Sequence, residues 1–143
     1  ANTKRIANRK NRLEGFPLLH LDFYKDDPKT LNWAKWIAAH GHHRSAPQGG
    51  IIRFQRIGPG LEAVASDAGL MICGLALIAG RVDEGEICLP FPAKTGIWTS
   101  HAFQTRFRRD ALLRPQVQRF RDWLETQAQM TVKDVRRIVR AAK

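Results

Sequence analysis

The stretch IIRFQRIGPGLEAVASDAGLMICGLALIA, residues 51–79, decides the fold. Its first five residues are β-branched or aromatic for the most part, which predicts a strand at 51–55. Pro59 is tolerated in the first turn of a helix, so we expect a helix over 61–68 that ends at Gly69. The ten uncharged residues 70–79 predict a buried strand that runs into a short helical turn. A strand, a helix and a second strand in this order are typical of an α/β fold.

The flanking segments extend this alternation. Residues 16–23, FPLLHLDF, predict a strand that ends in a turn, and Thr30 is expected to cap a helix that ends at Gly41. Downstream, 87–91 and 96–103 predict two short strands. Pro115 then opens a helix whose apolar side chains share one stripe: Val117, Phe120, Trp123, Leu124 and Ala128. The sequence therefore predicts an α/β fold in which helices flank a mixed sheet with a substantial parallel component.

Composition bounds the class of protein. The chain has 143 residues, of which 43% are hydrophobic, and this length is sufficient for one domain with a buried core. No apolar stretch approaches the roughly 20 residues that cross a bilayer, and the basic N-terminal residues precede no apolar signal segment. Two cysteines, Cys73 and Cys88, cannot form a disulfide framework. We expect a cytoplasmic protein with reduced thiols that makes no membrane contact.

The basic charge is concentrated at the two ends of the chain. Residues 1–12 carry +5 and residues 131–143 carry +4 of the formal net charge of +11, which leaves +2 for residues 13–130. The chain therefore divides into a basic N-terminal arm at 1–12, a nearly neutral domain at 13–130, and a basic segment at 131–143. In the last segment, Thr131 is positioned to cap a separate amphipathic helix with Asp134 three residues later.

Five pieces of the central domain, in order, resemble the effector-binding domain of LysR-type transcriptional regulators. They are Phe54, Ala68-Gly69, Leu77 with Gly85-Glu86-Ile87, Pro90-Phe91, and the helix motif Phe120-Arg121-Asp122-Trp123-Leu124. The resemblance covers roughly residues 13–128 and is nearest to the subgroup of glycine-cleavage and β-lactamase regulators. It implies one half of a type 2 periplasmic-binding-protein-like domain: the second subdomain, with the closing strand and helix. Met71 departs from the pattern, which has a second glycine there. A helix-turn-helix, a linker helix and the first subdomain have no counterpart in this sequence.

The resemblance implies that the chain senses a small, anionic metabolite and lacks its own DNA-reading domain. Arg56 is expected to hold a carboxylate and Gln55 to hydrogen-bond it, beside the positive end of the helix that follows. The expected effector-binding residues are Phe54, Gln55, Arg56 and Gly58, faced across a crevice by Trp98, Thr99 and Ser100. Phe54 as a core residue and Arg56 as a solvated loop charge are the alternatives. The segment 96–100 and the helix 116–128 would pack on the first subdomain, so we expect exposed apolar surface and a homo-oligomer.

The remaining motifs indicate no chemistry. The histidines His40, His42 and His43 are read as a solvated loop rather than a metal site, although His20 and Asp22 become candidate ligands if the fold brings them near. Cys73 is expected to be a buried small hydrophobe with no base beside it. Phosphate-binding, dinucleotide and nucleophile motifs are absent. We therefore expect no enzymatic activity, no cofactor and no metal.

The basic ends offer an alternative function. They favour a small nucleic-acid-binding module that contacts phosphates weakly and without sequence specificity. Its contact residues are Lys4, Arg5, Arg9, Lys10 and Arg12 in the arm and Lys133, Arg136, Arg137 and Arg140 in the C-terminal segment. Docking of that segment on its own domain is the competing interpretation.

Overall fold

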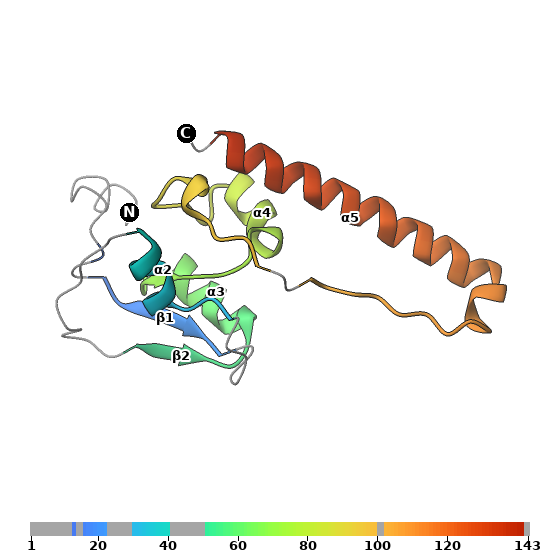
Figure 1. The fold of residues 1–143 in the computed structure, drawn as a ribbon, viewed down its shortest axis with the longest axis horizontal. Coiled ribbons are helices and arrows are strands. Elements are labelled where there is room, and N and C mark those ends of the chain that lie inside the picture. Colours follow the sequence, from blue (N-terminus) through green and yellow to red (C-terminus); the bar gives the residue numbers. More distant parts are fainter. Residues whose placement is uncertain (1–12, 14–15, 23–29, 41–50, 100–101, 142–143) are drawn as a thin grey trace.

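The computed structural model describes residues 13, 16–22, 30–40, 51–99 and 102–141. Strands and helices alternate along the first part of the chain, and a long helix closes it (Figure 1). The elements are β1 (Leu18–Leu21), α2 (Trp33–His40), β2 (Ile52–Phe54), α3 (Ile57–Ala65), β3 (Leu70–Met71), α4 (Leu75–Asp83), the 3-10 turns η1 (Ala93–Thr95) and η2 (Ala111–Leu113), and α5 (Pro115–Ala141). The predicted α/β class is confirmed.

The three strands form a parallel sheet in the order β2-β1-β3. Leu19 pairs with Ile52 on one side of β1 and with Met71 on the other. The Leu19 side chain is 0% exposed, so the centre of the sheet is also the centre of the core. The expected strands at 16–23, 51–55 and the start of 70–79 are confirmed, though each is shorter than its apolar run. The sheet is parallel throughout in the described part of the chain, so the mixed sheet that we predicted is not observed there.

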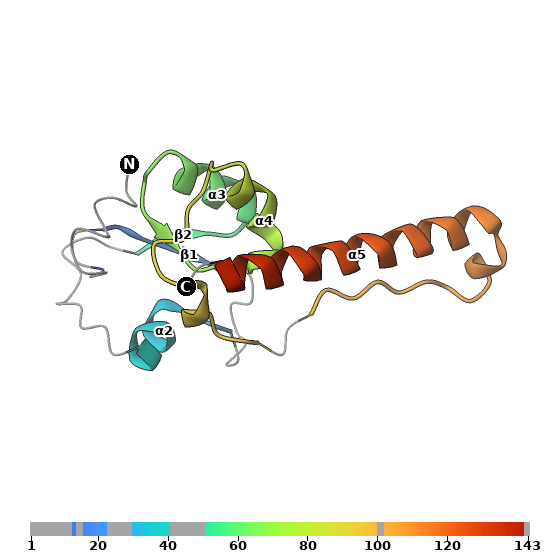
Figure 2. The same cartoon turned by 90° about the horizontal axis from the view of Figure 1, so that it is seen from above.

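Helices cover both faces of this sheet (Figure 2). On one face, α2 packs Trp33 and Trp36 onto a buried cluster that includes Leu13, Phe16, Leu18 and Leu70. On the other face, α3 and α4 enclose Leu61, Ile78 and Ile87. Alternate side chains of a strand point to opposite faces, which explains why Leu18 belongs to the α2 side. The result is a three-layer arrangement of helix, sheet and helix.

Both tryptophans of α2 bury their rings and satisfy their polar atoms. The Trp33 indole N–H donates to the carbonyl of Leu19 at 2.9 Å, and that of Trp36 donates to the carbonyl of Thr95 at 3.1 Å. The two rings meet edge to face with their centroids 5.9 Å apart. Because buried indole N–H groups need acceptors, these bonds fix α2 against β1 and against the η1 turn.

Helix α3 begins four residues before the position that the sequence predicted. Pro59 lies within its first turn rather than ahead of the helix. Gly60 then lets α3 approach the sheet closely, since a Cβ atom there would lie 2.9 Å from the sulfur of Met71. Met71 thus fills the space that Gly60 leaves over β3.

Two predicted strands are wrong. Residues 87–91 turn back after α4, where the N–H groups of Glu86 and Ile87 both donate to the carbonyl of Arg81. The chain then passes through η1 and continues without a ladder partner among the described residues of 96–103. A strand is defined by its neighbour. The apolar composition of 87–91 reflects the packing of Ile87 and Phe91 instead, whereas Ile97, Trp98 and Phe103 are exposed.

Helix α5 is one continuous helix, so the predicted break at Thr131 is wrong. The Thr131 hydroxyl donates to the carbonyl of Gln127 at 3.0 Å, which is a contact of the helix interior rather than a cap. No glycine or internal proline interrupts residues 116–141, and most residues on both sides of Thr131 favour helix. The amphipathic pattern at 131–141 therefore continues the helix that Pro115 opens.

The C-terminal end of α5 is docked on the body, while its N-terminal half projects from it (Figure 1). Ile138 is buried where α5 contacts α4. Beside it, the Arg137 guanidinium donates to both carboxylate oxygens of Asp83, at 2.8 and 2.5 Å. Docking of the basic segment on its own domain, one of the interpretations left open by the sequence, is observed through Arg137 and Ile138.

The Arg137–Asp83 contact makes this docking sensitive to acid. Hydrogen bonding to Arg137 lowers the pKa of Asp83 below its usual 3.8. A carboxyl whose pKa is lower in the folded state stabilises that state above its unfolded pKa, and this contribution is lost as the pH falls through the folded pKa. We expect Asp83→Asn to lower the melting temperature at pH 6 and to have a smaller effect near pH 3. An equal difference at both pH values, measured by circular dichroism, would contradict this.

Candidate functional site

The carboxyl ends of the parallel strands and the N-termini of α3 and α4 meet at one edge of the sheet. The connection from β1 to β2 runs through α2 on one face, and the connection from β2 to β3 runs through α3 on the other. In open α/β sheets, ligands bind outside the carboxyl ends of the strands at such a reversal. We define this carboxyl edge as Asp22, the segment Gln55-Arg56, and the segment Ile72-Cys73-Gly74.

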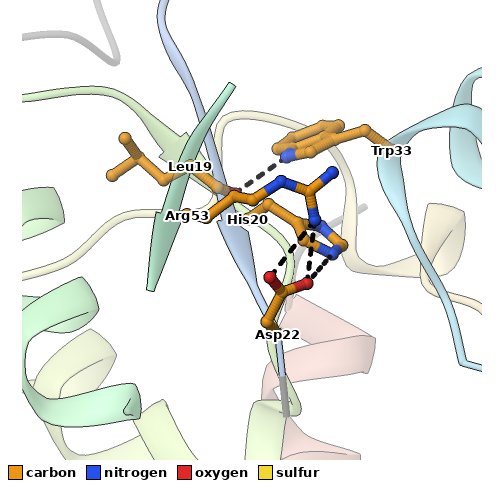
Figure 3. Close-up of polar contacts among 5 residues, drawn as sticks. All are labelled: Leu19, His20, Asp22, Trp33 and Arg53. Carbon is orange, nitrogen blue, oxygen red and sulfur yellow. Dashed lines mark hydrogen bonds and ion pairs between the residues drawn. The ribbon is translucent and has the colours of Figure 1, made fainter. Parts of the chain in front are cut away.

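A cluster of polar side chains lies at the end of β1 (Figure 3). The Asp22 carboxylate accepts hydrogen bonds from Arg53 at 2.9 and 3.2 Å, and its Oδ1 lies 3.1 Å from His20 Nε2. His20 and Asp22 share one face because they are two residues apart in an extended chain. Arg53 reaches them because it is opposite His20 in the β1–β2 register. The backbone N–H of Asp22 also donates to the carbonyl of Phe54 at 2.8 Å.

The sequence predicted this cluster only in part. His20 and Asp22 were candidate metal ligands only if the fold brought them near the histidines at 40, 42 and 43, and Arg53 was not singled out. The period-two spacing of His20 and Asp22 at the end of a strand is the signal that shows they share a face. Among the described residues, no group of three His, Cys, Asp or Glu side chains is placed to hold a metal ion. His42 and His43 lie outside the described residues.

The second part of the edge is the junction of β2 and α3. Arg56 is the residue that caps α3, in an extended conformation, and its side chain makes no capping bond. Gln55, Arg56 and Gly58 are exposed, and a Cβ atom at Gly58 would meet no heavy atom within 4 Å. The first N–H groups of α3 thus lack a side-chain cap, and open space lies beside Gly58. Together with the Arg56 guanidinium, these N–H groups give the start of α3 a positive electrostatic potential. Such a potential is suited to a small anion.

Phe54 differs from its neighbours at this junction. It is partly buried and packs over Gly60, where a Cβ atom would lie 3.5 Å from Phe54 Cγ. Strand alternation turns Phe54 toward α3 and Arg53 toward Asp22. The interpretation of Phe54 as a packing residue is therefore the better one.

The residues expected across the crevice are not brought to this junction. Trp98 and Thr99 lie in irregular chain after η1, and Trp98 is 87% exposed. No hydrogen bond or ring contact joins either of them to Phe54, Gln55 or Arg56 within the part of the chain that the structure describes. Ser100 lies outside that part. Trp98 and Thr99 belong to no strand, because no strand in the described part of the chain pairs with them.

Cys73 lies at the carboxyl edge, after β3 and just before α4. Burial raises its pKa to about 11, so it is a neutral thiol near physiological pH. It packs among the apolar side chains under α3 and α4. The expected apolar packing of Cys73 is observed, although the residue is partly buried rather than buried, and the thiol is unsuited to act as a nucleophile.

A second cationic surface lies on the last turns of α5. A shallow hollow there is lined by Lys133, Arg136, Arg137, Arg140 and Ala141. Arg137 is committed to Asp83 and Asp134, and these hydrogen bonds raise its pKa further. Lys133, Arg136 and Arg140 are exposed and have no ion-pair partner among the described residues. The basic arm at 1–12 lies outside the described part of the chain.

Comparison with protein-family models, curated proteins and solved structures found no match to this chain. Within the residues that the structure describes, no helix combines the length and the apolar character that a membrane span requires.

Proposed function

We propose that this chain is the effector-sensing portion of a LysR-type transcriptional regulator and binds a small anionic metabolite at the junction of β2 and α3. The observation that carries the proposal is the exposed Arg56 at the start of α3, beside helix N–H groups without a side-chain cap. A carboxylate at this point gains a bidentate guanidinium contact and the positive end of the helix. Gln55, one residue earlier, supplies an amide for orientation.

The topology supports the same location. The β2–α3 junction lies at the carboxyl edge of the parallel sheet, and this is the edge at which α/β proteins bind small ligands. The finer fold that we propose is the second half of a type 2 periplasmic-binding-protein-like domain. In this proposal DNA is contacted by a separate domain of the regulator, in the cytoplasm, and the chain has neither an enzymatic activity nor a cofactor. Trp98, Thr99 and Ser100 would complete the site only after the segment that contains them moves.

Arg56 is the residue whose removal tests the site. We expect Arg56→Ala to weaken binding of a carboxylate effector about 10- to 100-fold, since a hydrogen bond to a charged group contributes roughly 1.5–3 kcal/mol. Isothermal titration with a panel of amino acids and short carboxylates measures this. Arg109→Ala is the matched control, because Arg109 is an exposed arginine remote in sequence from the edge. Equal affinity in all three proteins would show that Arg56 does not hold the ligand.

The hollow on α5 favours a second candidate function, weak nucleic-acid binding through the basic ends. Lys133, Arg136 and Arg140 are exposed and share the last turns of one helix. Phosphate contacts of this kind weaken steeply with salt. Replacing these three residues by glutamine separates the two functions, because it would reduce DNA binding and leave effector binding unchanged.

A further inference from the structure

One side of α5 carries an apolar stripe whose two halves differ in burial. Phe120 and Ile138 are 18 residues apart, which is five turns at about 3.6 residues per turn, so they lie on the same side of the helix. Ile138 is buried at the end that contacts α4, whereas Phe120 is 51% exposed. The stripe that anchors α5 to the body therefore continues, half exposed at Phe120, along the half of the helix that projects from the body (Figures 1 and 2).

The uncovered half presents three large apolar side chains. Phe120, Trp123 and Met130 are each about half exposed and fall within roughly 80° of one another around the helix axis, at about 100° per residue. The Phe120 and Trp123 rings stack with centroids 5.8 Å apart, and Phe107 meets Phe120 edge on at 6.5 Å. A contiguous apolar patch held in place by such contacts marks an interaction surface.

The polar residues around this patch indicate what covers it. Helical spacing places Gln116, Gln127 and Asp134 on the same side of α5, with Arg119 at its margin. Arg121 lies on the far side and is paired with Asp122 at 2.7 Å. This face carries neutral amides and one acidic group, and its single cation, Arg119, lies at the margin. Such a face is suited to contact with an apolar protein surface. It does not fit a nucleic acid, which would need cations among the rings.

We infer that a second copy of this chain covers the patch through antiparallel pairing of the two α5 helices. With Glu125 at the centre of the pair, Phe120 of each copy faces Met130 of the other, and Trp123 faces Gln127. The face is thus self-complementary, as a two-fold interface requires, and methionine packs well against aromatic rings. This inference does not depend on the effector-binding function.

The charge distribution favours the antiparallel arrangement over the parallel one. The cations Lys133, Arg136 and Arg140 lie near the docked end of α5. Parallel pairing would bring both sets together, whereas antiparallel pairing places them at opposite ends and opposes the two helix dipoles. Each projecting half-helix then reaches toward the body of the other copy.

The size of the face sets the expected affinity. Residues 116–130 span about 21 Å at 1.5 Å per residue, which is one side of a short helix pair. Such a contact buries less than the roughly 800 Å² per partner of a standard complex. We therefore expect a dissociation constant in the micromolar range, with dimers forming over tens to hundreds of micromolar protein.

Sedimentation equilibrium between 1 and 300 μM tests the inference. We expect the wild-type chain to change from monomer to dimer, and the variant Phe120→Gln/Trp123→Gln to raise the dissociation constant at least tenfold. The control variant Leu77→Gln/Val132→Gln removes two exposed apolar side chains outside the stripe and should dimerise like the wild type. Circular dichroism verifies that all three chains keep the same helix content. A wild type that is monomeric at 300 μM, or a stripe variant that dimerises unchanged, overturns the inference.

Cysteine cross-linking tests the direction of pairing. In a background of Cys73→Ser/Cys88→Ser, we expect Phe120→Cys and Met130→Cys to form a disulfide-linked dimer only when the two variants are mixed and oxidised. Cross-linking within either variant alone would indicate parallel pairing and overturn the arrangement. Binding of a single-stranded oligonucleotide by a monomeric wild type, lost in Phe120→Gln/Trp123→Gln, would overturn the inference in favour of nucleic acid.

Discussion

Leu19→Ala is expected to lower the free energy of unfolding by about 2–5 kcal/mol. Leu19 is at the centre of the middle strand and its side chain is 0% exposed. Truncation leaves a cavity between the sheet and its helices that the neighbouring strands cannot fill, because Leu19 pairs with both of them. A small domain is stable by roughly 5–15 kcal/mol, so this loss is a large part of the total. Urea unfolding followed by tryptophan fluorescence measures it.

Ile52→Ala is the matched control for this prediction. Ile52 is the register partner of Leu19 on β2, but its side chain is 48% exposed. We expect a loss of no more than about 1 kcal/mol, because an exposed methyl group gains little on folding. Equal losses for the two variants would mean that the core is not centred on β1.

Gly69→Ala is the second substitution with a large expected effect. A Cβ atom at Gly69 would press against the backbone carbonyl oxygen of Pro17 and would lie 3.2 Å from Leu19 Cγ. That same carbonyl accepts the hydrogen bond from the Leu70 N–H at 2.9 Å, which begins the pairing of β1 with β3. Backbone has to shift to admit the methyl group, so we expect a destabilisation of about 1–3 kcal/mol.

Gly80→Ala has the opposite expected effect. Gly80 lies inside α4, and a Cβ atom there would meet nothing within 4 Å. Replacing a helical glycine by alanine stabilises by roughly 0.5–1 kcal/mol because the unfolded chain loses conformational freedom. The two glycine variants should therefore shift the urea midpoint in opposite directions. A shift of Gly69→Ala toward greater stability would show that the close approach to Pro17 is not maintained in solution.

Short-range patterns in the sequence predicted those helices and strands whose formation depends mainly on neighbouring residues. The apolar run before Pro28, the helix ahead of Gly41 and the strand-to-helix change within 70–79 are all observed, because propensity and periodicity act over a few neighbouring residues. The segment 96–103 has the composition of a strand, but its described residues, 96–99 and 102–103, form none, since a strand also needs a neighbour. Thr131 has a capping sequence and lies inside a helix, since the favourable residues before it continue the helix through that position.

The candidate site was predictable to a smaller degree. Arg56 was singled out through the resemblance to LysR-type effector domains, which implies a ligand between a strand end and a helix start, and the structure places it at the start of α3. The bond from Arg53 to Asp22 joins residues 31 positions apart, and it depends on the register of β1 and β2. Register is a property of the assembled sheet, and no local pattern in the sequence specifies it. The Arg137–Asp83 contact, which joins α5 to α4, was missed for the same reason.

The central claim is that the β2–α3 junction binds a small anionic effector. A thermal-shift screen of the full chain against amino acids, short carboxylates and other metabolites tests it most directly, with a DNA duplex included at two salt concentrations. We expect at least one carboxylate to raise the melting temperature of the wild type and to have little effect on Arg56→Ala. Stabilisation by DNA alone, fading as the salt concentration rises, would contradict the claim and favour the basic surface of α5.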